Sequence, residues 1–156
     1  MRGDPDETVP DALRGPVRPP RAQRVEPRVL LVIAVGGGLG TLARYGISRA
    51  IPVSEDSFPW ATFVTNLSGA FVLGLFLTTV LERFPPTRYP RPFFAIGFLG
   101  AFPTFSTMAV ETVTLVKDGE ALLGIGYLLV SVLAGLACCY LGIVLARVSP
   151  LGGDTR

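Results

Sequence analysis

The chain has 156 residues, of which 49% are hydrophobic, and 14 basic against 12 acidic side chains give a formal net charge of +2. Its mean hydropathy of +0.51 is high for a water-soluble domain of this length. The chain has no histidine, no Cys-x-x-Cys motif and no pair of carboxylates within one apolar segment, so the sequence shows no set of residues for metal or acid–base catalysis. We therefore expect no enzyme and no nucleic-acid partner.

Residues 1–28 differ in kind from the rest of the chain. They hold six prolines among mixed charges and few apolar side chains. Such a segment buries too little apolar surface to offset the entropy lost on ordering. It also lacks the apolar core of a signal peptide. We predict a disordered N-terminal tail over 1–28 and a short C-terminal tail over 148–156.

Four apolar stretches lie between these tails, over residues 29–50, 59–81, 92–116 and 121–146. Each is close to the roughly 20 residues that a helix needs to cross a bilayer. The short links favour antiparallel neighbours. The sequence thus predicts an all-α membrane protein with one domain of four transmembrane helices over 29–147.

Basic residues are distributed unevenly between the two sides of the membrane. With four spans, both termini and the 82–91 loop share one side, which leaves Arg44, Arg49 and Lys117 for the other. The first side carries eleven arginines: Arg2, Arg14, Arg18, Arg21, Arg24, Arg28, Arg83, Arg88, Arg91, Arg147 and Arg156. An excess of Lys and Arg marks cytoplasmic loops. We therefore predict a multi-pass protein of the cell (plasma) membrane with both termini in the cytoplasm.

The first span contains Gly36 and Gly40, a GxxxG pair that lets another helix backbone approach closely. Arg44 follows one turn later. Charged groups inside a membrane are costly and are functional candidates for that reason. An arginine near a helix end also reaches the interface by snorkelling, and taken alone Arg44 fits that interpretation better.

The second span places Thr62, Asn66 and Gly69 on one helix face by their i, i+4, i+7 spacing. An asparagine in hydrocarbon needs a hydrogen-bond partner, so Asn66 either belongs to a functional site or ties two helices together. Trp60 stands at the predicted boundary and is expected to anchor the helix at the interface.

The third span contains residues that interrupt a helix. Gly97, Gly100 and Pro103 are poor interior helix residues, and Pro103 also lacks an amide donor. We predict that the third helix is broken near 100–103. Irregular backbone at that depth survives only when it is buried in protein or faces a watery cavity. The freed carbonyls therefore need a ligand, for which a cation is the natural candidate.

Polar residues follow the predicted break. Thr104, Thr107 and Glu111 share one helix face, while Phe105 and Met108 stand one turn apart. From periodicity alone, packing against lipid or core explains Phe105 and Met108 better than a functional role.

The fourth span aligns Ser131, Gly135, Cys139 and Gly142 along one stripe. Small residues in such a stripe chiefly serve helix packing, with a polar track through Ser131 as the alternative. Cys138 and Cys139 are adjacent on the helix and point in divergent directions, so we expect packing residues rather than a disulfide.

Three motifs on successive spans are more specific together than any one alone. They read GGGLGTLARY, TNLSGAFVLG and GFLGAFPTFSTMAVE. In this order they resemble the Fluc/CrcB family of fluoride channels, whose pattern is GGxxGxxxR, then an Asn followed by Gly, then GGxTTFSTFxxE. The resemblance covers about residues 29–147 and omits the N-terminal tail.

The resemblance implies a fluoride-specific ion channel that gives passive fluoride efflux. Known members are antiparallel dimers of four-helix subunits, with two pores and a structural Na+ at the centre of the dimer. The carbonyls of Gly100 and Pro103 would bind that Na+, and no organic cofactor is expected. The implied fluoride pore contains Arg44, Asn66, Thr104, Phe105, Ser106, Met108, Thr107, Glu111 and Ser131, and the implied helix-packing residues are Gly36, Gly40, Gly69 and Gly135.

The residue types suit a small and strongly hydrated anion. Asn66 and the hydroxyls can donate hydrogen bonds that replace water around fluoride. The positive edge of the Phe105 ring offers a weaker contact to a passing anion.

Two positions depart from the family pattern, with Pro103 where Thr is usual and Met108 where Phe is usual. Proline keeps its carbonyl, whereas Met108 lacks the aromatic edge. A homodimer that inserts both ways also needs near-balanced flanking charge, which eleven against three is not. We therefore favour a heterodimer with a homologous subunit of opposite orientation over a homodimer.

Two other functions stay open at this point. The departures at Pro103 and Met108 suggest a non-conducting structural subunit of a heterodimeric fluoride channel. A small four-helix proton-coupled exporter is disfavoured, because such exporters rely on a carboxylate deep in the first helix. This chain has Arg44 there, and Glu111 lies near the far end of the third span.

Overall fold

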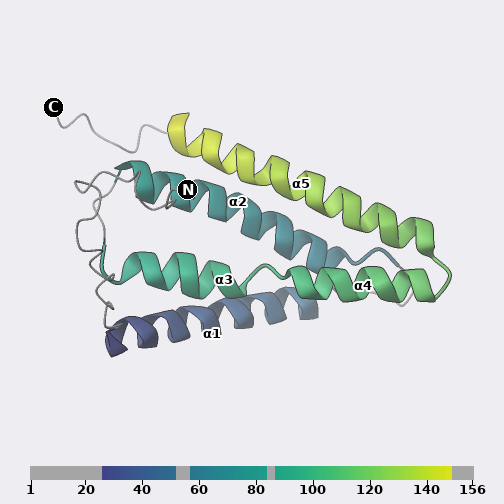
Figure 1. Cartoon of the computed structure of the whole chain (residues 1–156), viewed down its shortest axis with the longest axis horizontal. Coiled ribbons are helices and arrows are strands. Elements are labelled where there is room, and N and C mark those ends of the chain that lie inside the picture. Colours follow the sequence, from purple (N-terminus) through teal and green to yellow (C-terminus); the bar gives the residue numbers. More distant parts are fainter. Residues whose placement is uncertain (1–25, 52–56, 84–86, 149–156) are drawn as a thin grey trace, which may run out of the picture.

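The computed structural model describes residues 26–51, 57–83 and 87–148, and within them every regular element is a helix (Figure 1). The elements are α1 (Pro27–Ala50), α2 (Trp60–Arg83), the π-helix η2 (Pro92–Phe98), α3 (Leu99–Ala101), α4 (Phe105–Lys117) and α5 (Ala121–Val148). The segments long and apolar enough to cross a membrane are Pro27–Ala50, Trp60–Val80, Pro92–Lys117 and Ala121–Val148. The predicted all-α class and the four predicted spans are confirmed, with boundaries that differ by at most two residues.

The first helix begins earlier than predicted. Pro27 and Arg28, which the sequence assigned to the tail, form the start of α1. A proline suits the first helical position, because its missing amide would be unpaired there anyway. The rest of the predicted N-terminal tail, except Glu26, and residues 149–156 of the predicted C-terminal tail lie outside the described residues.

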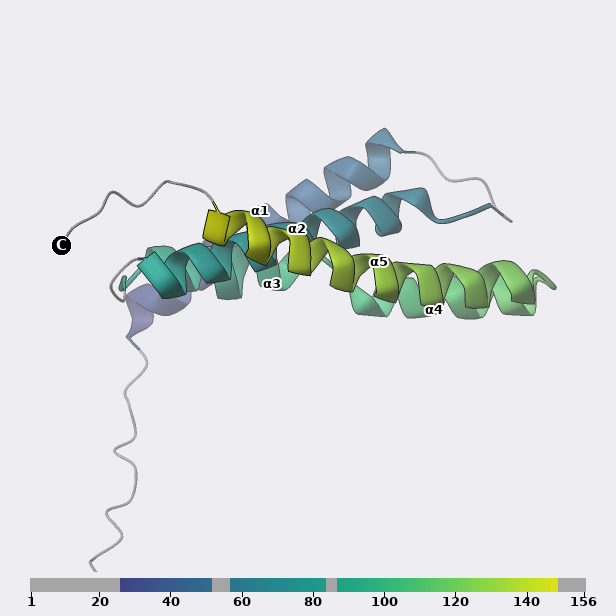
Figure 2. The ribbon, with the colours of Figure 1, turned by 90° about the horizontal axis from the view of Figure 1, so that it is seen from above.

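α2 packs along α5 over most of its length (Figures 1 and 2). Two glycines bring the backbones into contact. A Cβ at Gly74 would lie 2.2 Å from the carbonyl oxygen of Cys139, and one at Gly142 would lie 2.3 Å from that of Phe71. Glycine at both positions therefore removes the side chain that would hold the two helices apart.

α1 packs against the first part of the third span in the same manner. A Cβ at Gly40 would lie 2.4 Å from the carbonyl oxygen of Phe98, and one at Gly97 would lie 2.6 Å from that of Ile33. Gly36 makes the same kind of close contact with the backbone of η2. The predicted GxxxG pair thus lies directly against the third span.

The third span changes its packing partner along its length. η2 and α3 pack against α1, whereas α4 packs against α5. Helical structure stops at Ala101 and resumes at Phe105, and Figure 1 shows a short non-helical link between them. Figure 2 shows the C-terminal half of α1 turned away from α4. The link therefore lies where α1 and α4 diverge.

The buried core joins α4 to α5. Met108, Leu115 and Tyr127 form its centre, and the partly buried rings of Phe58 and Phe63 pack against them. This apolar cluster lies beyond the link toward the α4–α5 turn, so the space between α1 and α4 is left to other side chains.

Two ion pairs lie at the end of the bundle where α1 begins and α5 ends. Arg88 contacts Glu26, and Arg147 contacts Glu82 at 2.9 Å. The hydrogen bond and charge of Glu26 raise the pKa of Arg88 above its ordinary value. Both pairs are exposed, so they add little to the stability of the fold.

Candidate functional site

Asn66 of α2 binds the backbone of the link through both ends of its side-chain amide. The amide N–H of Thr104 donates to Oδ1 of Asn66 at 2.7 Å, and Nδ2 of Asn66 donates to the carbonyl oxygen of Thr104 at 3.1 Å. Thr104 is extended, with φ −141° and ψ 111°, so neither group follows the helical pattern. One side chain therefore satisfies both backbone groups of the residue.

Thr104 also caps α4. Its Oγ1 accepts a hydrogen bond from the amide of Thr107 at 3.2 Å, as an N-cap threonine does. The same oxygen lies 3.0 Å from Oγ1 of Thr107 and 3.2 Å from Oγ of Ser106. The three hydroxyls are thus connected at the N-terminus of α4, where the helix dipole is positive.

Two carbonyls of the link lose their helical donors. In an uninterrupted helix the carbonyl of Gly100 would accept from the amide of Thr104, and that of Pro103 from the amide of Thr107. The first amide instead donates to Asn66, and the second to Oγ1 of Thr104. Gly100 and Pro103 also line an open cleft of about 360 Å³. Carbonyl oxygens in this position fit a hard cation such as Na+, which prefers oxygen ligands.

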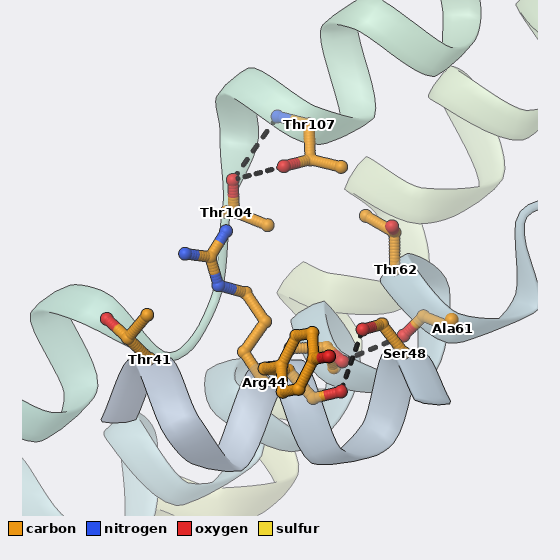
Figure 3. Close-up of a pocket in the computed structure, with 9 residues that line it drawn as sticks. Thr41, Arg44, Ser48, Ala61, Thr62, Thr104 and Thr107 are labelled. Atoms are coloured by element: carbon orange, nitrogen blue, oxygen red, sulfur yellow. Dashed lines mark hydrogen bonds between the residues drawn. The ribbon is translucent and has the colours of Figure 1, made fainter. Parts of the chain in front are cut away.

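A cavity of about 300 Å³ lies between α1, α2 and the start of α4 (Figure 3). Most of its wall consists of hydroxyl-bearing side chains from all three elements. The lining residues are Thr41, Arg44, Tyr45, Ser48, Ala61, Thr62, Thr65, Thr104 and Thr107. Several of these hydroxyls are already engaged, since Ser48, Thr62 and Thr65 donate to other groups, and the wall carries a single cation.

Arg44 is that cation, and Figure 3 shows its guanidinium reaching from α1 toward Thr104. Within the described residues the ion pairs are those of Arg88 and Arg147, and no carboxylate contacts Arg44. Arg44 also lines the cleft beside Phe105. An unpaired cation inside a membrane span is costly unless water or an anion faces it. The one charged side chain among the residues that line the cavity is therefore a cation.

Glu111 of α4 is held by two hydroxyl donors. Thr62 Oγ1 donates to its Oε1 at 2.7 Å, and the Tyr127 hydroxyl donates to its Oε2 at 2.8 Å. The carboxylate thus ties α4 to both α2 and α5. Sequence reasoning singled out Glu111 and the Thr62 face but missed Tyr127, because one tyrosine in a long apolar helix carries no spacing signal.

Replacing Tyr127 by phenylalanine should lower the free energy of unfolding by about 1–3 kcal/mol, because Glu111 then lacks one donor in a buried place. Thermal unfolding of the purified chain in detergent measures the change. Tyr140→Phe is the matched control, since Tyr140 lies on the same helix and is 66% exposed. Equal unfolding temperatures for the two variants would show that the Tyr127–Glu111 bond adds no measurable stability.

The family model described as "CrcB-like protein, Camphor Resistance (CrcB)" matches residues 31–143 of this chain. The chain belongs to the CrcB family. This family comprises ion channels and not enzymes, so the expectation that the chain is no enzyme is confirmed.

Relatives of this CrcB-family chain carry the name fluoride-specific ion channel. FluC 2 of Nocardia farcinica is 45% identical over 129 residues, which cover 83% of this chain and 92% of that protein. FluC 3 of Streptomyces avermitilis is 45% identical over 126 residues, covering 81% of this chain and 62% of that protein. FluC 1 of Mycolicibacterium paratuberculosis is 43% identical over 120 residues, covering 77% and 91% respectively.

The remaining residues implied by the CrcB motifs occupy different environments. Phe105 is 71% exposed, whereas Met108, one turn later, is 4% exposed and packs in the core cluster with Tyr127. Ser131 of α5 is also 4% exposed, and its Oγ has no hydrogen-bond partner among the described residues. A buried hydroxyl of this kind normally has a hydrogen-bond partner, and the described residues do not supply one for Ser131.

The predicted packing stripe of α5 makes its close contact at one end. Gly142 lies against the backbone of α2, whereas a Cβ at Gly135 would meet nothing within 4 Å. In the single chain Gly135 is therefore free of close neighbours, and a packing role for it stays a prediction for an assembly. Cys138 and Cys139 are both free thiols.

Proposed function

We propose that this chain is a subunit of a fluoride channel that lets fluoride leave the cytoplasm passively, down its gradient. The names of its relatives support the choice of ion. The observation that carries the proposal is Arg44, which lines the cavity with no carboxylate partner among the described residues. A cation attracts an anion, and no carboxylate of the described residues contacts Arg44 to cancel that attraction.

The proposed pathway runs along donors that can replace the water around fluoride. Arg44 and the hydroxyls of Thr104, Ser106 and Thr107 lie at its entry, beside the positive N-terminal end of α4. The exposed ring of Phe105 offers its positive edge there. Beyond the entry, the free hydroxyl of Ser131 is a further donor, with Met108 and Glu111 on the neighbouring helix.

We propose that a second four-helix subunit of opposite orientation completes the pore. The 71% exposure of the Phe105 ring and the open cleft beside it support a partner on this face. A structural Na+ at the dimer centre would be bound by the carbonyls of Gly100 and Pro103, which lack their helical donors. Two carbonyls are too few for such an ion, so the partner would supply the rest.

The charge distribution supports one fixed orientation in the cell membrane, with both termini in the cytoplasm. Arg28, Arg88, Arg91 and Arg147 lie near the end of the bundle where α1 begins and α5 ends, and that excess marks the cytoplasmic side. Because a chain with one orientation cannot form an antiparallel pair with itself, the partner is proposed to be a homologous subunit that inserts the other way.

Liposomes that contain this chain alone should release little fluoride, and liposomes that contain it with its homologous partner should release fluoride rapidly. We expect this difference in efflux because chains that all insert in one orientation cannot complete the wall of the pore. A fluoride electrode measures the efflux, and protein-free liposomes give the background. Flux that needs no proton gradient separates a channel from a coupled exporter.

Rapid efflux from the chain alone would overturn the heterodimer and leave the channel function intact. If neither preparation releases fluoride although both chains are folded, the result would contradict conduction and favour a non-conducting structural subunit. Met108 is buried in the core and not on an open face. This burial is the observation that supports a non-conducting structural subunit as the second candidate function.

A further inference from the structure

The link between α3 and α4 contains very few backbone donors, and each has a defined partner. The amide of Phe102 donates to the carbonyl of Phe98 at 2.9 Å, as in a helix. Pro103 has no amide hydrogen. The next amide, that of Thr104, donates to Oδ1 of Asn66 at 2.7 Å. Within the link itself, the amide of Thr104 is therefore the donor that has lost its helical acceptor, and Asn66 satisfies it.

The orientation of the Asn66 amide is fixed by this contact. Its oxygen faces the N–H of Thr104 and its nitrogen faces the C=O of Thr104. A flipped amide would place donor against donor and acceptor against acceptor, so only one orientation satisfies both bonds. Asn66 is not among the residues that line the cavity of about 300 Å³, whereas Thr104 is. In this arrangement the side chain holds the peptide of a pathway residue.

Gly69 completes the contact one helical turn further along α2. A Cβ at Gly69 would lie 2.9 Å from Cβ, 3.1 Å from Cγ and 3.2 Å from Cδ of Pro103. The proline ring is rigid and cannot swing aside as a long side chain can. Gly69 is therefore needed for the ring to lie flat against α2, in register with the hydrogen bonds of Asn66.

We propose that Asn66 and Gly69 form a cradle that holds the Pro103–Thr104 dipeptide, and that Asn66 acts as a positioning residue through this peptide. The cradle sets where the three hydroxyls at the start of α4 point, because Thr104 caps that helix and contacts Ser106 and Thr107. It also keeps the amide of Thr104 away from the carbonyl of Gly100. Fluoride transport itself rests on the proposed function, but the cradle does not.

Amide hydrogen exchange of the full chain tests the cradle without any use of fluoride. In Asn66→Ala the amide of Thr104 should exchange about tenfold faster, the factor that one hydrogen bond of ordinary net strength supplies. Gly69→Ala should also speed exchange at Thr104, although it removes no polar atom. Thr79→Ala is the control on α2, because Thr79 donates only within its own helix, to the carbonyl of Leu75.

A conservative variant separates the two bonds of the amide and guards against misfolding of the alanine variant. Asn66→Asp keeps an oxygen that accepts from the Thr104 amide but removes the donor to the Thr104 carbonyl. Exchange at Thr104 should therefore stay near the wild-type rate in Asn66→Asp. Fast exchange there, or wild-type exchange in a folded Asn66→Ala, would overturn the cradle.

Fluoride efflux from liposomes adds the functional result, in whichever assembly the wild-type chain conducts. Gly69→Ala should lower the efflux rate along with Asn66→Ala, while both keep an intact Arg44 and intact hydroxyls. One combination of results would refute the positioning role. Gly69→Ala would show wild-type efflux, whereas Asn66→Ala would show no efflux although its Thr104 amide stays protected from exchange. That combination would identify Asn66 as a direct donor to fluoride. Absence of efflux in every preparation would count against the proposed function alone, since the exchange result still decides the cradle.

Discussion

Replacing Gly40 by alanine should lower the free energy of unfolding by about 1–3 kcal/mol, the usual cost of forcing an extra methyl group into a packed interface. The added Cβ would lie 2.4 Å from the carbonyl oxygen of Phe98, 3.1 Å from its carbonyl carbon and 3.2 Å from its Cα. All three atoms belong to backbone, so the whole of α1 must move away from the third span. Thermal unfolding of the purified chain in detergent measures the loss.

Gly38→Ala is the matched control for this change. Gly38 lies on the same helix two residues earlier, and a Cβ there would meet nothing within 4 Å. Because alanine favours helix over glycine by about 1 kcal/mol in water, the control should be neutral or slightly stabilising. If Gly38→Ala and Gly40→Ala unfold at the same temperature, the close contact between α1 and η2 does not limit the stability of the chain.

The four spans were predictable because each is a long apolar stretch with short polar links, which is the strongest signal in the sequence of a membrane protein. Which spans pack against each other was not predictable. Gly36 and Gly40 indicate a close approach of another backbone, but nothing in the spacing says that it is the third span. The contact of Gly74 with Gly142 across α2 and α5 depends on the rotation of both helices. That rotation is set by tertiary packing and leaves no local signal.

The candidate site was predictable in its residue types and only partly in its geometry. Gly100 and Pro103 indicated the break near 100–103, and Thr104, Thr107 and Glu111 indicated a shared helix face after it, but the capping role of Thr104 was not predicted. The partner of Thr104 could not be found, since Asn66 lies 38 residues away and on another span. Tyr127, 16 residues after Glu111, was missed because a single tyrosine in a long apolar helix carries no spacing signal.

Arg44 shows that the position of a residue along a helix predicts the direction of its side chain less well than the helix face on which the residue lies. Its place near the end of a span made snorkelling toward the interface the better interpretation of the sequence alone. In the structure its guanidinium turns toward Thr104 and lines both the cavity and the cleft (Figure 3). The direction depends on where α1 and α4 diverge, and therefore on the break in the third span.

Replacing Arg44 by glutamine should reduce the rate of fluoride efflux by about ten- to hundredfold. A unit charge about 4 Å from an anion is worth roughly 4 kcal/mol at an effective dielectric constant of about 20, and water in an open cavity lowers that value. Glutamine keeps two donors and much of the length, so the change removes the charge with little change in shape. Efflux from liposomes, in the assembly that conducts, measures the rate.

Arg49→Gln is the matched control, since Arg49 is an exposed basic residue in the last turn of the same helix. It should leave the rate within about twofold, because Arg49 lines neither the cavity nor the cleft and a solvent-exposed charge is screened by salt. Arg44→Lys should keep most of the flux if charge is what the pathway needs, since lysine retains the charge but not the planar set of donors.

Raising the salt concentration should slow fluoride efflux through the wild-type chain more than through Arg44→Gln, because only the wild type gains from long-range attraction of the anion. Equal rates for Arg44→Gln and Arg49→Gln would mean that the hydroxyls and the N-terminus of α4 attract fluoride without help from the one unpaired cation of the cavity.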